Sequence, residues 1–436
     1  MMKKKHWKAV SVALVLAISL AGCGNQTSTE SLEASEEVSQ EASDTTEIEK
    51  TEENVSEESE TETSQEENVK SSEIDVDVTA EEFVADRSAA FELVSHMNVG
   101  WNLGNTFDSH GAGNTLSAEW YWGNPKTTQE MIDAIAEKGI NTIRIPVTWA
   151  EHVGPAPEYK INEEWLDRVQ EVVDYAVKND MYILLDTHHE PDYWMSPKPE
   201  MEKAVSAILS SVWTQIAERF KEYDEKLIFE GMNENRIKGS SNEWSGGTPE
   251  ERDVINRLNQ VFVDAVRATG GNNETRYLII STYGNNGGYQ AITELEIPED
   301  NNIIVALHLY TPYFFTYDAE GGYSEWDGSH KADIVNQAKL IDKELCKKKN
   351  VPVIITEFGA VNKNNEDEVV KWLEDYMNAM NKYGIKCIWW DNGNYAASGE
   401  KFAIFDRRNQ SWYAQKVVDK LVELAVTENQ IYPVQE

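Results

Sequence analysis

Short apolar runs alternate with amphipathic stretches of helical period from about residue 80 almost to the C-terminus. Eight of these runs have the length and β-rich composition of buried strands. They cover residues 97–104, 142–149, 182–190, 227–234, 277–284, 303–310, 351–359 and 387–393. Strands that alternate with helices in this way predict a parallel (β/α)₈ barrel, the TIM-barrel fold. A doubly wound open sheet is the alternative, but the sequence lacks the Gly-rich phosphate turn usual after an early strand.

Several of the predicted helices carry recognisable end signals. Asn162 is a predicted N-cap, and Thr127 with Glu130 has the spacing of a capping box in a helix that Gly139 ends. Further helices are predicted over 331–349, 366–383 and 411–425.

The first 22 residues have the pattern of a processing signal. Lysines at positions 3, 4, 5 and 8 precede an apolar stretch that is too short for a permanent membrane span. The stretch ends in Leu20-Ala21-Gly22-Cys23, which resembles the lipobox of bacterial lipoproteins. That resemblance implies cleavage before Cys23, lipid attachment to Cys23, and anchoring at the extracellular face of the bacterial membrane. An ordinary secretory signal, which would give a secreted protein, is the alternative.

The next segment, residues 23–79, is predicted to be a disordered acidic tether. Residues 24–77 contain 19 Asp or Glu but only Lys50 and Lys70, and aromatic side chains are almost absent before Phe83. The folded domain is expected over residues 80–428, with a short tail at 429–436. The formal net charge of −38 argues against nucleic acid as a partner, and we expect a monomer.

Beyond Cys23, the sequence has two cysteines, Cys346 and Cys387. Two cysteines do not make a disulfide framework in a domain of this size, so two buried free thiols are expected. A single bridge between them is the alternative.

Polar residues gather where the predicted strands end. They are Arg144, His188, His189, Asn233, Glu234, His308, Tyr310, Glu357, Trp390 and Asn392. In a (β/α)₈ barrel the C-terminal ends of the strands carry the chemistry, so this pattern indicates a functional site.

The strongest pair in this set is Glu234 and Glu357, which close the fourth and seventh predicted strands. Two carboxylates that face one cavity raise the proton affinity of one of them. One protonated and one ionised carboxyl suit glycosidic-bond cleavage. Glu230, by contrast, is expected to be a structural ion-pair partner near the barrel wall.

The histidines raise the alternative of a metal-dependent barrel hydrolase, because His188, His189 and His308 could contribute to a zinc site. Adjacent histidines on a strand should point to opposite faces, which disfavours this reading. His308 and Tyr310 share strand parity and should face the same way. Trp389 and Trp390 differ in parity, and Trp390, which shares parity with Asn392, is expected in the site.

The strand-end motifs together resemble glycoside hydrolase family 5, most closely its bacterial endoglucanases and xyloglucanases. The motifs are NVGWNLGNTFD, GINTIRIPVTW, LLDTHHE, IFEGMNEN, HLYTPYFF, ITEFGA and WWDNG, spread over about residues 82–426. The resemblance implies a retaining β-glycanase without metal or organic cofactor.

The same resemblance assigns roles to individual residues. It implies that Glu234 is the acid/base, Glu357 the nucleophile, and Asn233 the contact to the sugar 2-hydroxyl. It places Arg144 and Tyr310 at the nucleophile, His308 beside the acid/base, and His188 and Trp390 along the −1 subsite. The sequence departs from many members at Asn235, where proline is common.

The expected substrate is a soluble β-1,4-linked glucan cut at internal bonds. Aromatic residues in the loops suit a long open cleft; they are Trp120, Tyr121, Trp122, Tyr193, Trp194 and Trp244. The alternatives are a xyloglucan-specific endoglucanase, a mannanase, and a surface glycan-binding protein without turnover.

Overall fold

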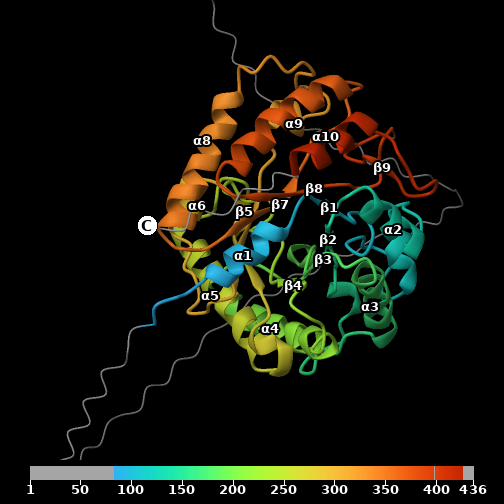
Figure 1. The fold of residues 1–436 in the computed structure, drawn as a ribbon. Helices are drawn as coiled ribbons and strands as arrows, with labels where there is room; N and C mark the ends of the chain where they lie inside the picture. Colours follow the sequence, from blue (N-terminus) through green and yellow to red (C-terminus); the bar gives the residue numbers. More distant parts are fainter. Residues whose placement is uncertain (1–82, 397, 426–436) are drawn as a thin grey trace, which may run out of the picture. The chain divides into compact units, whose positions relative to one another are not determined.

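The computed structural model describes residues 83–396 and 398–425, whose centre is a closed barrel of eight parallel strands (Figure 1). The strands are β1 (Gly100–Asn102), β2 (Thr142–Ile145), β3 (Tyr182–Asp186), β4 (Leu227–Glu230), β5 (Leu278–Asn286), β6 (Ile303–His308), β7 (Val353–Phe358) and β8 (Lys386–Trp389). Each strand pairs with the next in sequence, and β8 closes on β1. The predicted barrel is therefore confirmed. The predicted signal peptide, the tether with Cys23, and the tail at 429–436 lie outside the described residues.

Helices surround the barrel and connect each strand to the next (Figure 1). The α-helices are α1 (Ser88–His96), α2 (Gln129–Glu137), α3 (Glu163–Val177), α4 (Glu202–Arg219), α5 (Pro249–Arg267), α6 (Tyr289–Thr293), α7 (Tyr313–Thr316), α8 (Lys331–Ile341), α9 (Glu366–Asn381) and α10 (Gln415–Ala425). Short 3₁₀ turns are η1 (Leu116–Trp120), η2 (Ala150–His152), η3 (Glu190–Asp192) and η4 (Gly271–Glu274), and η5 (Asp342–Lys347) is a π-helical continuation of α8. A small hairpin, β9 (Phe405–Asp406) with β10 (Ser411–Trp412), precedes α10.

The helix-end signals give mixed results. Asn162 caps α3 as predicted, because its side chain accepts hydrogen bonds from the backbone of Glu164 and Trp165. The capping box at Thr127 is wrong: α2 begins after Thr128, and Thr127 donates its backbone N–H to Glu119 instead. Gly139 does follow the end of α2, with a left-handed φ of 99°. The predicted helix at 411–425 is wrong at its start, where residues 411–412 form β10.

The interior of the barrel contains two layers of different chemistry. Near one end, apolar side chains of the strands pack against α1; the strand residues include Leu184, Ile228, Ile304, Ala306 and Ile354, and those of α1 include Leu93 and Val94. Two positions further along the same strands stand Asp186, Glu230, His308 and Thr356. Burial of the apolar layer against α1 closes one end of the barrel and leaves the opposite end for polar side chains.

A second, larger apolar layer lies between the strands and the surrounding helices. It contains fully buried Trp165, Trp213 and Trp372, and it also holds Cys346 and Cys387. Both cysteines are buried free thiols, as expected. No helix among the described residues is long and apolar enough to cross a membrane.

The strand ladders become irregular at the polar end of the barrel. The register shifts between β5 and β6, between β6 and β7, and between β7 and β8. Bulges of this kind redirect side chains near strand ends. After the shift, His308 stands opposite Glu357, so the irregular ladder brings a histidine and a carboxylate of the predicted site together.

Candidate active site

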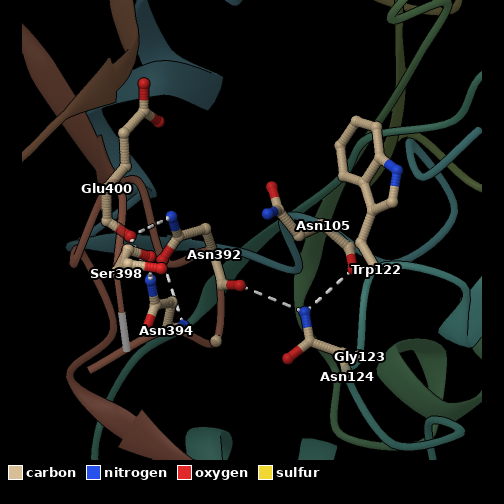
Figure 2. Close-up of a pocket in the computed structure, with 9 residues that line it drawn as sticks. Asn105, Trp122, Gly123, Asn124, Asn392, Asn394, Ser398 and Glu400 are labelled. Carbon is tan, nitrogen blue, oxygen red and sulfur yellow. Dashed lines mark hydrogen bonds between the residues drawn. The ribbon is translucent and has the colours of Figure 1, made fainter. Parts of the chain in front are cut away.

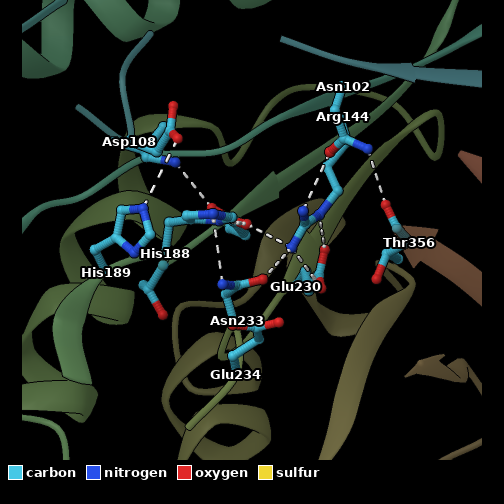
Figure 3. A network of polar contacts seen from close by, with 12 residues as sticks. Asn102, Asp108, Arg144, His188, His189, Glu230, Asn233, Glu234 and Thr356 are labelled. Atoms are coloured by element: carbon cyan, nitrogen blue, oxygen red, sulfur yellow. Dashed lines mark hydrogen bonds and ion pairs between the residues drawn. The ribbon is translucent and has the colours of Figure 1, made fainter. Parts of the chain in front are cut away.

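Arg144 of β2 occupies the centre of the polar layer, and its guanidinium is shared among side chains from four other strands or strand ends (Figure 3). It donates to Glu230 at 2.6 and 3.0 Å, Asn233 at 2.7 Å, Asn102 at 3.1 Å and Glu357 at 2.8 Å, and lies 2.8 Å from Asp186. Burial alone would lower the pKa of Arg144, but the carboxylates of Glu230, Asp186 and Glu357 outweigh it and raise that pKa well above its usual value. Arg144 is therefore a permanent buried cation.

Glu357 stands near the end of β7, with both carboxylate oxygens occupied. Oε1 accepts from Nη1 of Arg144 at 2.8 Å, and Oε2 accepts from the hydroxyl of Tyr310 at 3.0 Å. Burial, together with the negative charge of Glu234, raises the pKa of Glu357, whereas His308 and Arg144 lower it. The two hydrogen bonds orient Glu357 and favour its ionised form.

Glu234 lies four residues beyond the end of β4, and its backbone is strained. Its φ of 43° is in the left-handed region, which a glutamate rarely adopts. The backbone N–H donates to Oδ1 of Asn285 at 2.7 Å, and Nδ1 of His308 lies 2.9 Å from Oε1. Burial raises the pKa of Glu234, although Arg236 and Arg144 oppose this shift. The side chain remains 21% exposed, so it can still meet a ligand.

Glu234 and Glu357 face each other across a short gap. An oxygen of Glu234, an oxygen of Glu357 and a ring nitrogen of His308 all lie within 4.8 Å of one another. Carboxyl groups about 5–5.5 Å apart are typical of retaining glycosidases, and those of inverting enzymes are about 6.5–9.5 Å apart. The geometry therefore fits direct attack by one carboxylate and proton transfer by the other.

His188 forms one wall of the same site. Its Nδ1 lies 2.8 Å from Asp186, its Nε2 lies 3.5 Å from the amide of Asn233, and its ring stacks on Trp390 with centroids 5.7 Å apart. Burial, and then the charge of Arg144, lower the pKa of His188 well below its usual value. A neutral imidazole in this position is a hydrogen-bonding group rather than a proton donor.

The comparison with known families decides the assignment. Residues 98–396 match the family model described as cellulase, glycosyl hydrolase family 5. The chain belongs to glycoside hydrolase family 5.

Relatives within family 5 cover nearly the whole folded domain. The chain is 50% identical over 341 residues to endoglucanase A of Ruminococcus albus, an alignment that spans 77% of this chain and 93% of the relative. It is 55% identical to the crystal structure of XEG5A, a xyloglucan-specific endo-β-1,4-glucanase from a metagenomic library in complex with cellotriose. That match covers 78% of this chain and 99% of the other, with a TM-score of 0.76. A broad-specificity endoglucanase from Ruminococcus champanellensis with bound cellotriose is 42% identical, covering 78% of this chain and 99% of its own, with a TM-score of 0.74.

In this family 5 barrel, the two tryptophans at the end of β8 separate as their parity predicts. Trp389 is buried in the core and donates its indole N–H to the backbone of Phe402, whereas Trp390 faces His188. Asn392 shapes the following loop: its amide donates to the backbone of Glu400, and its oxygen accepts from the backbone of Asn394.

The loops after β1 and β8 enclose a cavity of about 500 Å³ (Figure 2). Its lining is mostly polar and comprises Asn105, Trp122, Gly123, Asn124, Asn392, Gly393, Asn394, Ser398 and Glu400. The amide of Asn124 ties the two loops together by donating to the backbone of Asn105 and of Asn392. Amide and hydroxyl groups around one aromatic ring are suited to a carbohydrate.

The expectation that His188 and His189 point apart is wrong. β3 ends at Asp186, so both histidines lie in the turn after the strand, where strand parity does not apply. Their rings meet edge to face with centroids 4.6 Å apart. His189 also lies beside His110 and Trp122, with its Nε2 3.9 Å from Asp108. His189 therefore supports the loops around the site.

Three groups of described residues have donor atoms close enough for a metal ion. They are Glu234 with His308 and Glu357, Asp108 with His188 and His189, and His110 with His189 and Asp192. The first group coincides with the two facing carboxyls, and in the third Asp192 already pairs with Lys238. The prediction that the reaction needs no metal stays a prediction, and activity after chelation is its test.

Sequence reasoning missed several groups that hold the site. Asp186 orients His188 and pairs with Arg144, and Asn102 accepts from Arg144 while donating to the backbone of Thr356. Asp186 is the last residue of β3, and its place at a strand end would have indicated it. Asn285 carries no comparable signal, because its contact with Glu234 depends on how two loops meet.

The loop aromatics are mostly exposed, as a carbohydrate cleft requires. Those exposed are Trp120, Tyr121, Trp122, Tyr193 and Trp244, whereas Trp194 is half-buried against the core. Tyr313 and Phe314 of α7 are also exposed, and the sequence analysis did not single them out.

Proposed function

We propose that the protein is a retaining endo-β-1,4-glucanase in which Glu234 is the acid/base and Glu357 the nucleophile. The observation that carries this proposal is the short gap between the two carboxylates, with Arg144 and Tyr310 bound to Glu357. Membership of family 5 and relatives named endoglucanases support the same reaction.

In the first step, Glu357 attacks the anomeric carbon while Glu234 protonates the departing oxygen. The pair can hold one proton because both ionised together would place two negative charges within a buried site. Arg144 and Tyr310 favour the ionised form of Glu357, which leaves the proton with Glu234.

In the second step, water releases the sugar from Glu357. Glu234 gave its proton to the departing oxygen in the first step, and esterification has removed the charge of Glu357. Glu234 is therefore ionised and takes a proton from the water that attacks the anomeric carbon, which releases Glu357 as a carboxylate. We expect Asn233, whose oxygen accepts from Arg144, to present its amide N–H₂ to the sugar 2-hydroxyl. We expect His188 and Trp390, whose rings stack on each other, to line the sugar that reacts.

The substrate proposal is a soluble β-1,4-glucan, including mixed-linkage glucan, cut internally. Purified enzyme should release reducing ends from carboxymethylcellulose faster than from mannan, and the reverse order would contradict the glucanase assignment. A glycan-binding protein without turnover would release none from either.

Xyloglucan is a second candidate substrate, because the polar cavity of about 500 Å³ that Asn392 helps to line is expected to accept a branch sugar. The similarity of this chain to XEG5A, a xyloglucan-specific endo-β-1,4-glucanase, supports the same candidate. Comparing kcat/KM on xyloglucan and on mixed-linkage glucan separates the two candidates.

For the N-terminal region we propose lipid attachment at Cys23, a tether at 23–79, and a monomeric enzyme at the extracellular face of the membrane. The support is the lipobox-like sequence before Cys23 and the rule that two or more acyl chains give stable anchoring. Cys23→Ser should move the enzyme from the membrane fraction to the soluble fraction without changing its activity. Unchanged membrane association would contradict the anchor.

A further inference from the structure

Arg236, in the loop after β4, touches both the carboxylate of Glu234 and an exposed tryptophan. Its Nη1 donates to the backbone oxygen of Glu234 at 3.0 Å and lies 3.3 Å from Oε2 of the same residue. Its guanidinium also stacks over the ring of Trp244, with Cζ 4.0 Å from the ring centroid. One side chain therefore connects the proposed acid/base to an aromatic surface.

The loop holds this arrangement in place. Glu243 accepts from Nε of Arg236 at 3.1 Å and from the backbone of Gly239 at 2.7 Å. The backbone oxygen of Trp244 accepts from Asn286, at the end of β5, at 2.9 Å. Arg236 itself is largely buried, with 13% of its side chain exposed. Both the guanidinium and the indole are therefore positioned before any ligand arrives.

Trp244 is 58% exposed, although Arg236 lies over one face of its ring. The opposite face is thus available to the apolar face of a pyranose ring. Trp244 belongs to the loop after β4, whereas Trp122 and Asn392 belong to the loops after β1 and β8. β4 lies opposite β1 and β8 in the closed barrel. A glucan that crosses between Glu234 and Glu357 therefore meets Trp244 on one side of the bond that breaks, and Trp122 with Asn392 on the other.

We propose that Trp244 is the binding platform for a glucosyl unit of the leaving group, and that Arg236 is a positioning residue that couples this platform to Glu234. The proposal rests on the retaining glucanase reaction. The leaving-group side is assigned because Glu234 protonates the departing oxygen and Arg236 joins Trp244 to that carboxyl.

The other groups that face Glu234 act alongside Arg236. They are Glu243, Arg144, His308, Tyr310, Tyr317 and Glu357. Arg236, whose Nη1 lies 3.3 Å from Oε2 of Glu234, opposes the raised pKa of that residue more strongly than Arg144 does. Its removal therefore raises the pKa of Glu234 further, while the other groups stay unchanged.

The platform is tested with two substrates that differ only in the leaving group. Cellotetraose places glucosyl units on both sides of the bond, whereas β-cellobiosyl fluoride has fluoride as its leaving group and no sugar for Trp244. Trp244→Ala should lower kcat/KM for cellotetraose about 10-fold, equivalent to about 1.4 kcal/mol. The same variant should change kcat/KM for the fluoride less than about 2-fold, and Trp244→Phe should recover part of the loss on cellotetraose.

Equal losses on both substrates, or no loss on either, would overturn the platform. The proposed function fails in a different way, because the wild-type enzyme would then turn over neither substrate. If Trp244→Ala does not fold, judged by circular dichroism, the ratio of the two substrates in Trp244→Phe against wild type gives the same test with a smaller expected change.

The coupling is tested by the pH profile of kcat/KM on cellotetraose. Arg236→Met should move the alkaline limb to higher pH, because the acid keeps its proton longer without the neighbouring cation. Arg257→Met is the matched control, since Arg257 pairs with Glu202 on the helical exterior; its profile should equal that of wild type. An alkaline limb unmoved or moved to lower pH in Arg236→Met would overturn the coupling.

Discussion

Leu184 and Asp186 stand two residues apart on β3 and are both fully buried, but their neighbours have opposite chemistry. Leu184 packs with Ile228 and Ile354 in the apolar layer beside α1, whereas Asp186 lies 2.8 Å from the guanidinium of Arg144. The same step separates Ile228 from Glu230 and Ala306 from His308.

The difference shows how the barrel divides stability from chemistry. The apolar layer gains free energy by removing hydrocarbon from water, at roughly 25 cal/mol per Å². The polar layer holds several charges that are costly to bury and stable only while each keeps its partners. Substitutions in the apolar layer should thus lower the free energy of unfolding alone. Those in the polar layer should lower both the free energy of unfolding and kcat.

The largest effect is expected at the nucleophile of the polar layer. Glu357→Gln should lower kcat on carboxymethylcellulose by about 10⁴-fold or more, because an amide cannot form the glycosyl ester. The amide keeps the shape of the side chain, so binding of cellotetraose by calorimetry should persist. Wild-type turnover in this variant would identify the wrong nucleophile.

Arg144→Met should affect both unfolding and catalysis. It leaves Glu230 and Asp186 buried without their cation, a loss of about 3–5 kcal/mol in the free energy of unfolding. Denaturant unfolding measures this loss, and kcat should fall because Glu357 loses one of its two hydrogen bonds. Adding Glu230→Met should restore part of the stability and none of the activity. Recovery of activity in the double variant would contradict the role given to Arg144.

Leu184→Ala tests the apolar layer of the same strand. The cavity it creates should cost about 2–5 kcal/mol in the free energy of unfolding. Because no catalytic group changes, kcat measured well below the melting temperature should stay within about 2-fold of wild type. A loss of kcat as large as that of Arg144→Met would break the proposed division between the layers.

The smallest effect is expected for Glu190→Gln, and it depends on pH. Glu190 is fully buried; Oε1 accepts from the backbone of Trp149 at 2.6 Å, and Oε2 has no hydrogen-bond partner among the described residues. Burial raises the pKa of Glu190 to about 8. The stability from the protonated carboxyl is thus present below the ordinary glutamate pKa and is lost as pH rises through about 8.

Glutamine has no proton to lose. The melting temperature of Glu190→Gln should therefore rise relative to that of wild type as the pH increases from 5 to 9. The advantage of the variant in the free energy of unfolding should grow with each pH unit over this range, because the wild-type protein loses the contribution of its protonated carboxyl. A difference independent of pH would mean that Glu190 is already ionised in the folded protein.

The barrel was predictable because its signals are local and repeated: each strand is a short apolar run, and each helix has its own period. The facing of Glu234 and Glu357 followed from the rule that barrel strands present their ends to one site. The N-cap at Asn162 was also predictable, because the signal lies in the sequence next to the helix that it begins. Thr127 failed because its backbone N–H bonds to Glu119, a tertiary contact that no local pattern reveals.

Other parts of the site depended on loop geometry. His188 and His189 lie past the strand, so a parity rule applied to them gave the wrong orientation. The contacts of Arg236 with Glu234 and Trp244, and that of Asn285 with Glu234, join positions whose proximity depends on the folded loops. The sequence contains the residues, but the folded loops determine their partners.

The central claim is that Glu234 and Glu357 act as a retaining pair, and product stereochemistry tests it most directly. Proton NMR of the anomeric signals during the first minutes of cello-oligosaccharide hydrolysis distinguishes the two outcomes before mutarotation mixes them. The account predicts that the newly formed reducing end appears first as the β-anomer. First appearance of the α-anomer would show single displacement and contradict the roles given to both carboxylates.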